Sequence, residues 1–464
     1  MNILVLNLPR YEGIPVTREY RCEPILKNHI LTPTTSLTLA AILRNQGHKV
    51  SFIDANAYDL SFYDISERIK NKKIDCIIFS FNSQIIDYDM KICHIAKENN
   101  HSCITIGYSW YAKGFAEGIL GEYPDLDILI VGEPLSTICN LGKCLNGDRK
   151  LETLGGIAFR NGNELKVDRN NMEMPLDEAP FPAYDLLPSF RPYHVISQFF
   201  SPFAMVISGR GCPFGCRFCN VSRTKYNCKL PANVVNELKT LQRIGGVRYV
   251  WFFDEVFTLR RRRVIEICTR IIREGIKIKW FCDTRVDLVD EDLLKLMHKA
   301  GCIGIAYGVE SGSQRILTDM NKGISIEQIK KASIWTRKAH IPFQMNLILG
   351  YRQETPETIR ETKLLVNTIL PENLQIGIAA PKPGTEFAKT EFESVQNSED
   401  YDWKVELTGR PNSSCSDTSY IAAEIKNIKK TLILNPKWWL NSANMLSWNS
   451  CLVFPIIDRY LLRR

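Results

Sequence analysis

Three cysteines stand close together in the segment SGRGCPFGCRFCN, which runs from Ser208 to Asn220. Cys212, Cys216 and Cys219 have the spacing C-x3-C-x2-C on a loop that directly follows the strand-like run AMVIS. Three thiolates on one short loop can bind three irons of a 4Fe-4S cluster and leave the fourth iron open to a substrate or cosubstrate. The spacing therefore predicts a metal centre with an open coordination position.

A closed site is the alternative interpretation of the same cysteines. A structural zinc or a closed cluster needs four ligands, and Cys228 is the next thiol along the chain. No second C-x2-C pair follows the loop, which favours the open site. The loop also carries three glycines that allow a compact backbone: Gly209, Gly211 and Gly215.

The composition indicates a large protein of a reducing compartment. The chain has 464 residues, 45% of them hydrophobic, which is enough for two or three domains. Its 15 cysteines are an odd number spread over a long chain, and several lie in apolar runs such as DCIIFSF, so disulfides are not expected. No apolar run approaches the roughly 20 residues of a bilayer span, and the first residues lack the features of a signal peptide. We therefore expect a cytoplasmic protein without a transmembrane segment.

The formal net charge of +8 does not by itself indicate an acidic partner. The basic residues are dispersed along the chain, and the one dense run, LRRRR at 259–263, is expected on a solvated helix face. Nucleic-acid binding is therefore not predicted.

The first 165 residues predict a doubly wound, Rossmann-like α/β domain. Short β-branched runs such as NILVLNL, KVSFIDA, DCIIFSFNS, SCITIGY and LDILIVGEP alternate with helical patterns such as SLTLAAILRNQG. That rhythm is typical of a parallel sheet with helices on its faces. Ligands of such sheets bind beyond the carboxyl ends of the strands, so we expect a binding site at that edge.

A second α/β domain is predicted after a proline-rich linker. The pattern breaks at residues 166–195, where MPLDEAPFPAYDLLPSFRPY holds the chain extended. Residues 196–390 then show six strand signals separated by helix-length segments, which favours a partial or full βα-barrel with chemistry at the strand ends. Residues 391–464 form a small C-terminal region of uncertain architecture. Its segment KWWLNSANMLSW is as consistent with packing on the barrel as with contact to a ligand or a membrane surface.

The cysteine loop resembles the signature of radical S-adenosylmethionine (SAM) enzymes. CPFGCRFC follows the first barrel strand, and Phe218 matches an aromatic position of the family loop. The resemblance implies that the open iron binds the amino and carboxylate groups of SAM, and that an electron from the cluster cleaves SAM to a 5′-deoxyadenosyl radical. It also implies an external electron donor such as flavodoxin or ferredoxin.

The later strand ends resemble the same family in the correct order. FFDEVFT places Asp254 and Glu255 at the acidic position that receives the SAM amino group. CDTRVD and GVESGSQRILTDMNKG make Arg285, Glu310 and Ser311 candidate contacts to the SAM carboxylate or ribose. ILGYRQET and PKPGTEF match the fifth and sixth strand ends. Plainer roles are open for each residue: Asp254 or Glu310 could cap the following helix, and Arg285 could neutralise them.

A doubly wound domain joined to such a barrel resembles the cobalamin-binding (B12-binding) subfamily of radical SAM enzymes. That subfamily includes the anaerobic magnesium-protoporphyrin monomethyl ester cyclase and the class B radical SAM methyltransferases. The resemblance covers about residues 1–390 and implies cobalamin at the strand ends of the first domain. The matching turn residues are Ser80, Phe81, Asn82, Ser83, Gly107, Gly132 and Glu133.

The ligand on the lower face of the cobalt is left open by the sequence. The motif D-x-H-x-x-G, whose histidine binds cobalt from below in better-known cobalamin proteins, surrounds none of the seven histidines. His48 in NQGHKV is most simply a turn residue. The segment TREYRCE, Thr17–Glu23, is interpreted either as a neighbour of one corrin face or as a charged surface loop. We therefore expect cobalt without a histidine ligand.

The resemblance implies methylation of an unactivated carbon of a small-molecule or natural-product substrate. The 5′-deoxyadenosyl radical would remove a hydrogen, methylcobalamin would deliver a methyl group, and a second SAM would remethylate the cobalt. One alternative is ring formation or oxidative rearrangement without methyl transfer. Another is a non-enzymatic iron-sulfur and corrinoid electron-transfer protein, which the acidic strand ends disfavour because a carrier needs no SAM site. The sequence does not identify the substrate.

Overall fold

Two compact units make up the computed structural model of this chain. The structure describes residues 1–19, 23, 25, 29–70, 72–147, 150–162, 164–170, 173–195, 201–392, 403–408 and 418–440. Unit 1 contains Met1–Met205, Leu241–Val247 and the helix at 403–408. Unit 2 contains Val206–Thr240, the described residues from 248 to 392, and those from 418 to 440. Among all these residues, no helix combines the length and the apolar character needed to cross a membrane.

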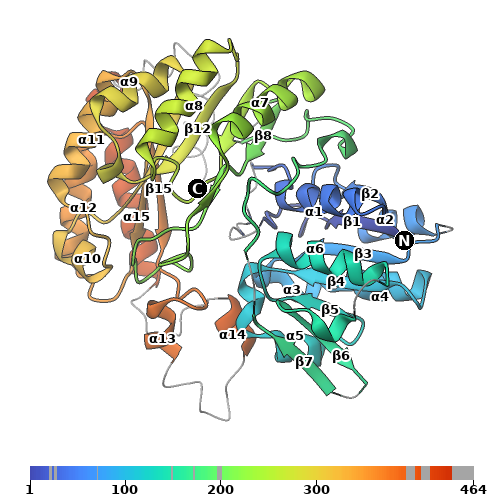
Figure 1. Ribbon diagram of the computed structural model, residues 1–464. Coiled ribbons are helices and arrows are strands. Elements are labelled where there is room, and N and C mark those ends of the chain that lie inside the picture. The colour runs from blue at the N-terminus through green and yellow to red at the C-terminus, as the bar shows by residue number, and fades with distance from the viewer. Residues whose placement is uncertain are drawn as a thin grey trace. The chain divides into compact units, whose positions relative to one another are not determined.

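Unit 1 contains a seven-stranded sheet in the order β2-β1-β3-β4-β5-β6-β7 (Figure 1). The first five strands along the chain pair in parallel, and β6 and β7 add an antiparallel hairpin at one edge. The prediction of a doubly wound parallel sheet is confirmed. The strands are β1 Asn2–Asn7, β2 Lys49–Asp54, β3 Cys76–Ser80, β4 Ile104–Tyr108, β5 Ile128–Ile130, β6 Ile157–Asn161 and β7 Glu164–Asp168.

Helices flank the sheet of unit 1, which explains why its central strands are apolar throughout. β3 is buried at every position, as expected for a parallel strand covered on both faces. α1 packs beside α6, and α2 packs beside α4. The helices are α1 Thr34–Asn45, α2 Phe62–Ile69, α3 Ile86–Asp89, α4 Lys91–Asn99, α5 Ala116–Glu122 and α6 Pro134–Leu145, with short 3-10 turns η1 Ser83–Ile85, η2 Trp110–Gly114, η3 Leu151–Thr153 and η4 Tyr184–Leu186.

The segment predicted as a linker packs on unit 1. The β6–β7 hairpin extends to Asp168, three residues past the predicted domain end, and its turn contains Gly162 at φ +62°. Tyr193 donates a hydrogen bond from its hydroxyl to Asp54 at 2.8 Å, and the backbone N–H of Ala183 donates to the carbonyl of Leu37. The hairpin was not predicted because β7 is short and mostly exposed, and Leu165 and Val167 are its only apolar residues.

Unit 2 contains a six-stranded sheet in the order β15-β14-β13-β12-β11-β8. Strands β11 to β15 pair in parallel with their neighbours, which confirms the prediction of a partial βα-barrel of six strands. Helices α8, α9, α11 and α12 line one side of this sheet (Figure 1). The strands are β8 Phe203–Val206, β11 Tyr249–Phe252, β12 Lys279–Thr284, β13 Cys302–Glu310, β14 Phe343–Leu349 and β15 Asn373–Ile378. The helices are α7 Pro231–Gly245, α8 Arg261–Arg273, α9 Glu291–Lys299, α10 Gln314–Asp319, α11 Ile326–Lys338 and α12 Pro356–Ile369, with the 3-10 turn η5 Val286–Leu288. Residues 203–205 of β8 and 241–245 of α7 are counted with unit 1.

The described residues of the C-terminal region form helices that belong to different units. α13 is Glu386–Phe392, α14 is Trp403–Thr408 and α15 is Thr418–Ile433. α15 packs against α12 and β15 in unit 2, whereas α14 belongs to unit 1. In the segment KWWLNSANMLSW, Trp438 is buried and donates from Nε1 to the carbonyl of Pro371 at 2.7 Å, and residues 441–448 lie outside the described part. The described start of that segment thus packs on the barrel.

Candidate active site

A two-stranded ribbon closes the base of the cysteine loop. β9, Gly209–Arg210, pairs in antiparallel fashion with β10, Asn227–Cys228. Gly211 has φ +89°, and a Cβ there would lie 2.0 Å from the carbonyl oxygen of Lys225, so only glycine fits. Cys228 pairs with Gly209 at this base, outside the loop that carries the three clustered cysteines.

The three predicted cluster ligands lie together on this loop. Cys212 and Cys216 are buried, and the backbone N–H of Cys219 donates to the carbonyl of Cys216 at 3.2 Å. Burial, together with a smaller effect of the neighbouring Cys216 and Cys212, raises the pKa of the Cys219 thiol to about 12. Uncompensated thiolates are therefore costly here, and a cationic metal cluster would reverse that cost.

The donor set fits an iron-sulfur cluster in type and spacing. Within the described residues, no three Cys, His, Asp or Glu side chains already converge as a metal would require, so the sulfurs of the loop would have to turn toward a bound cluster. None of the three cysteines forms a disulfide. The three thiols thus have the number and the chemistry of a cluster donor set.

Phe218 anchors the loop to the strand ends of unit 2. Its ring packs against an apolar cluster formed by Ile316, Met320, Tyr351, Ala379 and Phe387. Next to it, Arg217 donates from its backbone to the carbonyl of Met320 and forms ion pairs with Asp319 and Glu386. The aromatic position of the loop therefore has a packing role in this structure.

Asp254 bonds Ser208, the residue at the start of the segment that carries the cysteine loop. One carboxylate oxygen accepts from the backbone N–H of Ser208 at 2.7 Å, and the other accepts from the Ser208 hydroxyl at 2.6 Å. Burial raises the pKa of Asp254 to about 6, against the opposing charge of Arg263. Asp254 does not cap the following helix, because α8 begins at Arg261 with Arg260 as its N-cap residue.

Glu255 contacts the loop itself. Its carboxylate accepts a hydrogen bond at 3.0 Å from the backbone N–H of Gly211, the residue before the first cysteine. Glu255 is only partly buried, whereas Asp254 is 2% exposed. Of the two predicted acids, Glu255 therefore keeps the greater access to a ligand.

Arg285 lies under the cysteine loop at the end of β12. Its guanidinium carbon is 3.7 Å from the centre of the Phe214 ring, and two nitrogens bond Asp287 at 2.9 and 3.0 Å. A third bond, at 2.9 Å, goes to the carbonyl of Lys322. The plainer expectation that Arg285 neutralises Asp254 or Glu310 is wrong, because its acidic partner is Asp287.

Glu310 ends β13 in a strained backbone conformation. Its φ is +70°, in the left-handed region that costs a non-glycine residue of the order of 1 kcal/mol, and the pairing with β14 shifts register at this point. Oε1 of Glu310 accepts a hydrogen bond from Nζ of Lys322 at 2.7 Å. The capping role is wrong here too, because Ser313 is the N-cap residue of α10.

Ser311 points away from these charges. It is fully buried, and its hydroxyl accepts from the backbone N–H of Ser313 at 3.1 Å and lies 3.4 Å from the hydroxyl of Thr362 in α12. The neighbouring Gly312 allows this close approach, because a Cβ there would lie 2.4 Å from Cα of Thr362. The structure gives Ser311 a role in packing the strand end on α12.

Two functional candidates escaped the sequence analysis. Lys322 is 6% exposed, pairs with Glu310, and its Nζ lies 5.8 Å from the centre of the Phe218 ring. Arg263 is also buried and donates to the carbonyls of Ser208 and Lys229, so the run at 259–263 is not wholly a solvated helix face as expected. Lys322 could have been found from the run MNKG at the end of the segment GVESGSQRILTDMNKG. The lysine in this run is separated from the end of β13 by one short helix, α10.

The predicted cobalamin turn at the end of β3 is buried and already bonded within the protein. The four residues of this turn, each 4% exposed or less, are Ser80, Phe81, Asn82 and Ser83. Ser83 donates from its backbone N–H and hydroxyl to one carboxylate oxygen of Glu23, at 2.7 and 2.6 Å. Ser109, just past the end of β4, donates to the other oxygen at 2.5 Å. Glu23 therefore joins the carboxyl ends of β3 and β4.

The other predicted cobalamin contacts have local roles. A Cβ at Gly107 would lie 3.2 Å from Leu126 and 3.4 Å from Phe79, so this glycine serves side-chain packing within the sheet. Glu133 is the N-cap residue of α6, and it accepts from the backbone N–H of Ser136 at 2.8 Å. Gly132 donates from its backbone to the carbonyl of Gly156. Gly132 and Glu133 follow β5, the parallel neighbour of β4, and therefore lie at the same edge of the sheet as the β3 turn.

The described part of the segment Thr17–Glu23 is no surface loop. Arg18 forms a buried ion pair with Asp89, with bonds of 2.7 and 2.8 Å, and Glu19 accepts from the N–H of Thr35 near the start of α1. The side-chain amide of Asn82 donates to the carbonyls of Thr17 and Glu23. The segment is therefore fastened to the β3 turn, which excludes the interpretation as a charged surface loop.

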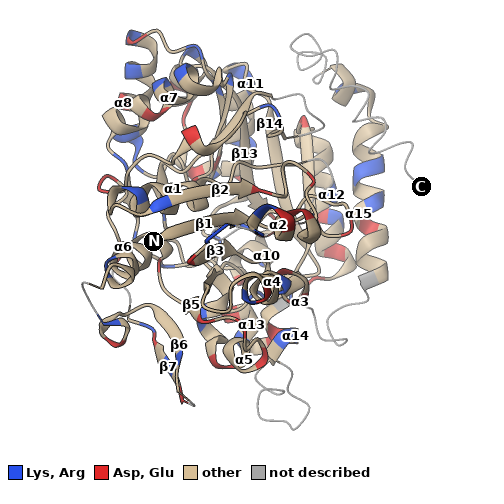
Figure 2. Cartoon of the chain, turned by 90° about the vertical axis from the view of Figure 1, so that its right-hand side faces the viewer, with Lys and Arg blue, Asp and Glu red and all other residues tan. Residues whose placement is uncertain are grey.

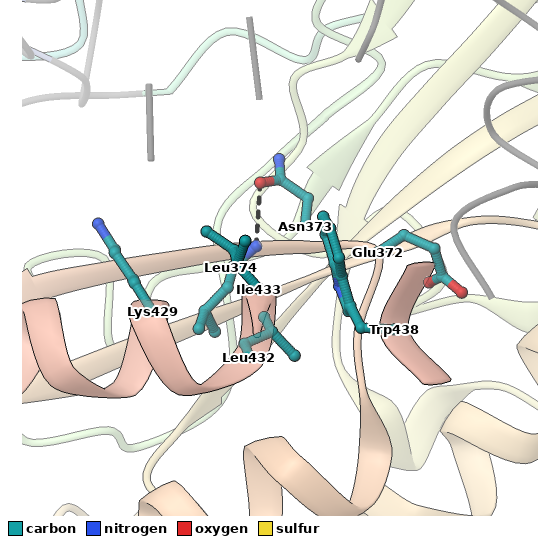
Figure 3. Close-up of a pocket in the computed structure, with 7 residues that line it drawn as sticks. All are labelled: Glu372, Asn373, Leu374, Lys429, Leu432, Ile433 and Trp438. Carbon is teal, nitrogen blue, oxygen red and sulfur yellow. Dashed lines mark hydrogen bonds between the residues drawn. The ribbon is translucent and has the colours of Figure 1, made fainter. Parts of the chain in front are cut away.

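A small pocket lies at the opposite end of the unit 2 strands (Figure 3). Its lining includes Asn373, the first residue of β15, together with Leu432, Ile433 and Trp438. The predicted site residues of unit 2 lie at or just after the carboxyl ends of their strands. This pocket therefore belongs to the docking of α15 and not to the candidate active site.

A comparison with protein families matches residues 206–366 to the radical SAM superfamily. An uncharacterized methyltransferase of Pyrococcus horikoshii is 31% identical over 360 residues, which cover 76% of this chain and 77% of the relative. An anaerobic magnesium-protoporphyrin IX monomethyl ester cyclase of Rubrivivax gelatinosus is 29% identical, and the alignment covers 74% of this chain but only 63% of that enzyme.

Two solved structures share the fold. The cobalamin-dependent SAM radical enzyme OxsB, with aqua-cobalamin and SAM bound, has a TM-score of 0.73 at 19% identity, covering 98% of this chain and 72% of OxsB. The radical SAM methyltransferase TsrM of Kitasatospora setae, with cobalamin and a cluster bound, has a TM-score of 0.69 at 14% identity, covering 85% of this chain and 75% of TsrM. Sequence and fold agree, and we conclude that the chain belongs to the radical SAM superfamily and has the fold of its cobalamin-dependent members.

Proposed function

We propose that the protein is a cobalamin-dependent radical SAM methyltransferase that methylates an unactivated carbon of a small-molecule substrate. The observation that carries the proposal is the charge pair at the end of β13. Glu310 is held in a strained backbone conformation beside the cysteine loop, and Lys322 faces it at 2.7 Å. Strain of this kind is retained where the surrounding structure needs a side chain in one place, and such places are often functional sites.

The strand ends of unit 2 offer the groups that SAM requires. Glu310 and Lys322 present opposite charges next to Phe218, and Glu255 presents a partly buried carboxylate next to Gly211. We assign these three charged residues to the ammonium, carboxylate and ribose hydroxyl groups of SAM. When cluster and SAM are bound, they supply the 5′-deoxyadenosyl radical. Asp254, Arg263 and Arg285 position the loop and do not need to touch the cofactor.

The ends of β3 and β4 in unit 1 offer the groups that a corrinoid requires. The corrin periphery carries amide side chains, which can donate to the carboxylate of Glu23 and exchange hydrogen bonds with the hydroxyls of Ser83 and Ser109. Two described histidines have other partners: His48 bonds the carbonyl of Gly142, and His194 bonds that of Pro192. The motif D-x-H-x-x-G also surrounds none of the seven histidines. We therefore propose that cobalt has no histidine ligand from this chain.

Counting the by-products of SAM tests the proposed reaction. Methylation consumes two SAM molecules per turnover, one giving S-adenosylhomocysteine and the other 5′-deoxyadenosine with methionine. With anaerobically reconstituted protein and substrate, the two by-products should approach equal amounts as methylated product accumulates. Product with 5′-deoxyadenosine but without S-adenosylhomocysteine would reject methylation in favour of ring formation or oxidation.

The reducing equivalent must come from a partner. We propose a flavodoxin or ferredoxin as electron donor, since the chain itself shows one three-cysteine loop for a cluster. Reduction by dithionite alone, in the absence of any protein donor, provides the reference rate for SAM cleavage. A rate increase on adding the reduced donor protein supports this assignment, and an unchanged rate contradicts it.

A further inference from the structure

We propose that helix α14, which comes from the C-terminal region, is a clasp that fixes the distance between the two cofactor-binding turns of unit 1. The proposal rests on the cobalamin function proposed above, but its structural half can be tested without any cofactor. α14 lies in the sequence after the whole barrel, yet it groups with unit 1. In both views it lies beside α5 (Figures 1 and 2).

The helix is built into the core of unit 1. Leu407 is 1% exposed and belongs to the apolar cluster that contains Phe81, Ile86 and Phe115. Phe81 follows β3 directly, and Phe115 lies between η2 and α5, after β4. α14 also contacts η1, the turn that contains Ser83. Leu407 thus belongs to the same apolar core as residues of both segments that leave these strand ends, and α14 contacts one of these segments directly at η1.

Trp403 adds a close contact with α5. Its indole ring approaches Gly118 so closely that a Cβ on this glycine would lie 3.0 Å from two indole carbons. The ring also faces Phe115, with centroids 6.3 Å apart. Glycine at position 118 therefore admits the indole.

Lys404 bridges acidic groups on the two segments. Its Nζ bonds Asp87 of α3 at 2.8 Å and also bonds Glu122 of α5. The same ammonium lies 5.5 Å from the centre of the Tyr123 ring. α3 follows the β3 turn and α5 follows the β4 turn, so one lysine of α14 spans both.

These contacts have a consequence for the proposed corrinoid site. Ser83 and Ser109, which hold Glu23 between them, lie on the two segments that α14 joins. Displacing α14 should therefore loosen the spacing of the two hydroxyls and weaken corrinoid binding. The cysteine loop lies in unit 2, so reductive SAM cleavage should persist.

The variant Gly118→Ala tests the clasp from the side of α5. The added methyl must push Trp403 by a few tenths of an ångström, whereas alanine itself is the stronger helix former. Gly121→Ala is the matched control, because it lies in the same helix and a Cβ there meets nothing within 4 Å. Leu407→Ala and Val405→Ala form a second pair on α14, since Val405 is 38% exposed.

Two measurements on the full-length protein decide the outcome. Hydrogen exchange of the cofactor-free protein should become about tenfold faster or more at residues 83–89 and 116–123 in Gly118→Ala and Leu407→Ala, and remain unchanged in both controls. Hydroxocobalamin, followed by its visible absorbance, should bind those two variants at least tenfold more weakly than the controls.

Each result has a distinct meaning. Unchanged exchange in both variants overturns the clasp, and faster exchange with unchanged hydroxocobalamin affinity overturns its role in cofactor binding. If the native protein binds no hydroxocobalamin, the proposed function fails, while the exchange data still test the clasp.

Discussion

The ammonium group of Lys322 lies 2.7 Å from a carboxylate oxygen of Glu310, and both side chains are buried at the end of β13. Gly308 makes room for the pair, because a Cβ there would lie 2.6 Å from the Glu310 carboxylate and 3.0 Å from the lysine Nζ. A glycine, a strained glutamate and a buried lysine thus form one arrangement beside the cysteine loop. In the proposed SAM site, this pair would face the charged groups of the zwitterionic cofactor.

Removal of the lysine charge should weaken SAM binding. Lys322→Met keeps the length of the side chain but leaves Glu310 buried without its cation, so the KM for SAM in reductive cleavage should rise at least about tenfold, equivalent to about 1.4 kcal/mol. Cluster iron should stay unchanged, because Lys322 supplies no ligand. Lys330→Met on the exposed face of α11 is the control. An unchanged KM for SAM would show that Lys322 does not contribute to SAM binding.

The four cysteines near the loop should separate into two classes. Alanine at position 212, 216 or 219 should abolish the four-iron cluster and all SAM cleavage, because the loop offers no replacement thiol. Cys228→Ala should keep both, since Cys228 lies in β10 at the base of the ribbon. Iron and sulfide analysis after anaerobic reconstitution measures this. Loss of the cluster in Cys228→Ala would restore the closed four-ligand site.

A partly buried acid on β12 should make the stability of unit 2 depend on pH. Burial raises the pKa of Asp283 to about 7 from an ordinary value of 3.8, opposed by a 2.6 Å bond from Nε1 of Trp251 and helped by the charge of Asp254. The folded form therefore binds the proton more tightly than the unfolded form. The protonated Asp283 carboxyl contributes fully to the stability of the folded form below pH 3.8, and this contribution is lost as the pH rises through 7. The loss amounts to roughly a few kcal/mol.

The variant Asp283→Asn isolates this effect. Asparagine keeps an acceptor for Trp251 and has no proton to lose, so the Tm of the native protein should fall relative to the variant between pH 5.5 and pH 8. Thermal unfolding at several pH values measures the difference. A difference in Tm that is constant across this range would show that Asp283 does not titrate there.

Most of the strands and helices could be predicted because parallel strands have a recognisable local sequence pattern. CIIFS in β3 and FQMNLIL in β14 are apolar runs or alternations of strand length, and helices follow each of them. β7, with the sequence ELKVD, alternates over only two apolar residues and is mostly exposed, and it was missed. Tyr193 lies outside the predicted domain of residues 1–165 but bonds the buried Asp54, so a fragment ending at 165 would lose part of its own core.

The side-chain contacts of the candidate site were harder to predict, because a motif identifies which residues are present but not which partners they bond. Asp254 occupies an expected acidic position, yet both its oxygens bond Ser208, a partner that is 46 residues away. Lys322 joins Glu310 only through the geometry of a strained strand end. Such long-range pairings depend on the packed fold and leave no period or spacing in the sequence.

Glu23 provides the sharpest test of the corrinoid site. Its two carboxylate oxygens bond Ser83 and Ser109 at the ends of β3 and β4, and the carbonyl of Glu23 accepts from Asn82. If corrin amides bind here, Glu23→Ala should reduce hydroxocobalamin affinity at least about tenfold, because a charged acceptor contributes about 1.5–3 kcal/mol.

Glu23→Gln should lie between alanine and the native residue, since it keeps one acceptor oxygen without the charge. Glu98→Ala, on the exposed face of α4, controls for the loss of a carboxylate elsewhere in unit 1. Reductive SAM cleavage, which depends on unit 2, should be unchanged in all three variants. Tighter hydroxocobalamin binding by Glu23→Ala would contradict the assignment and show instead that Glu23 occupies the place of the cofactor and must leave before it binds.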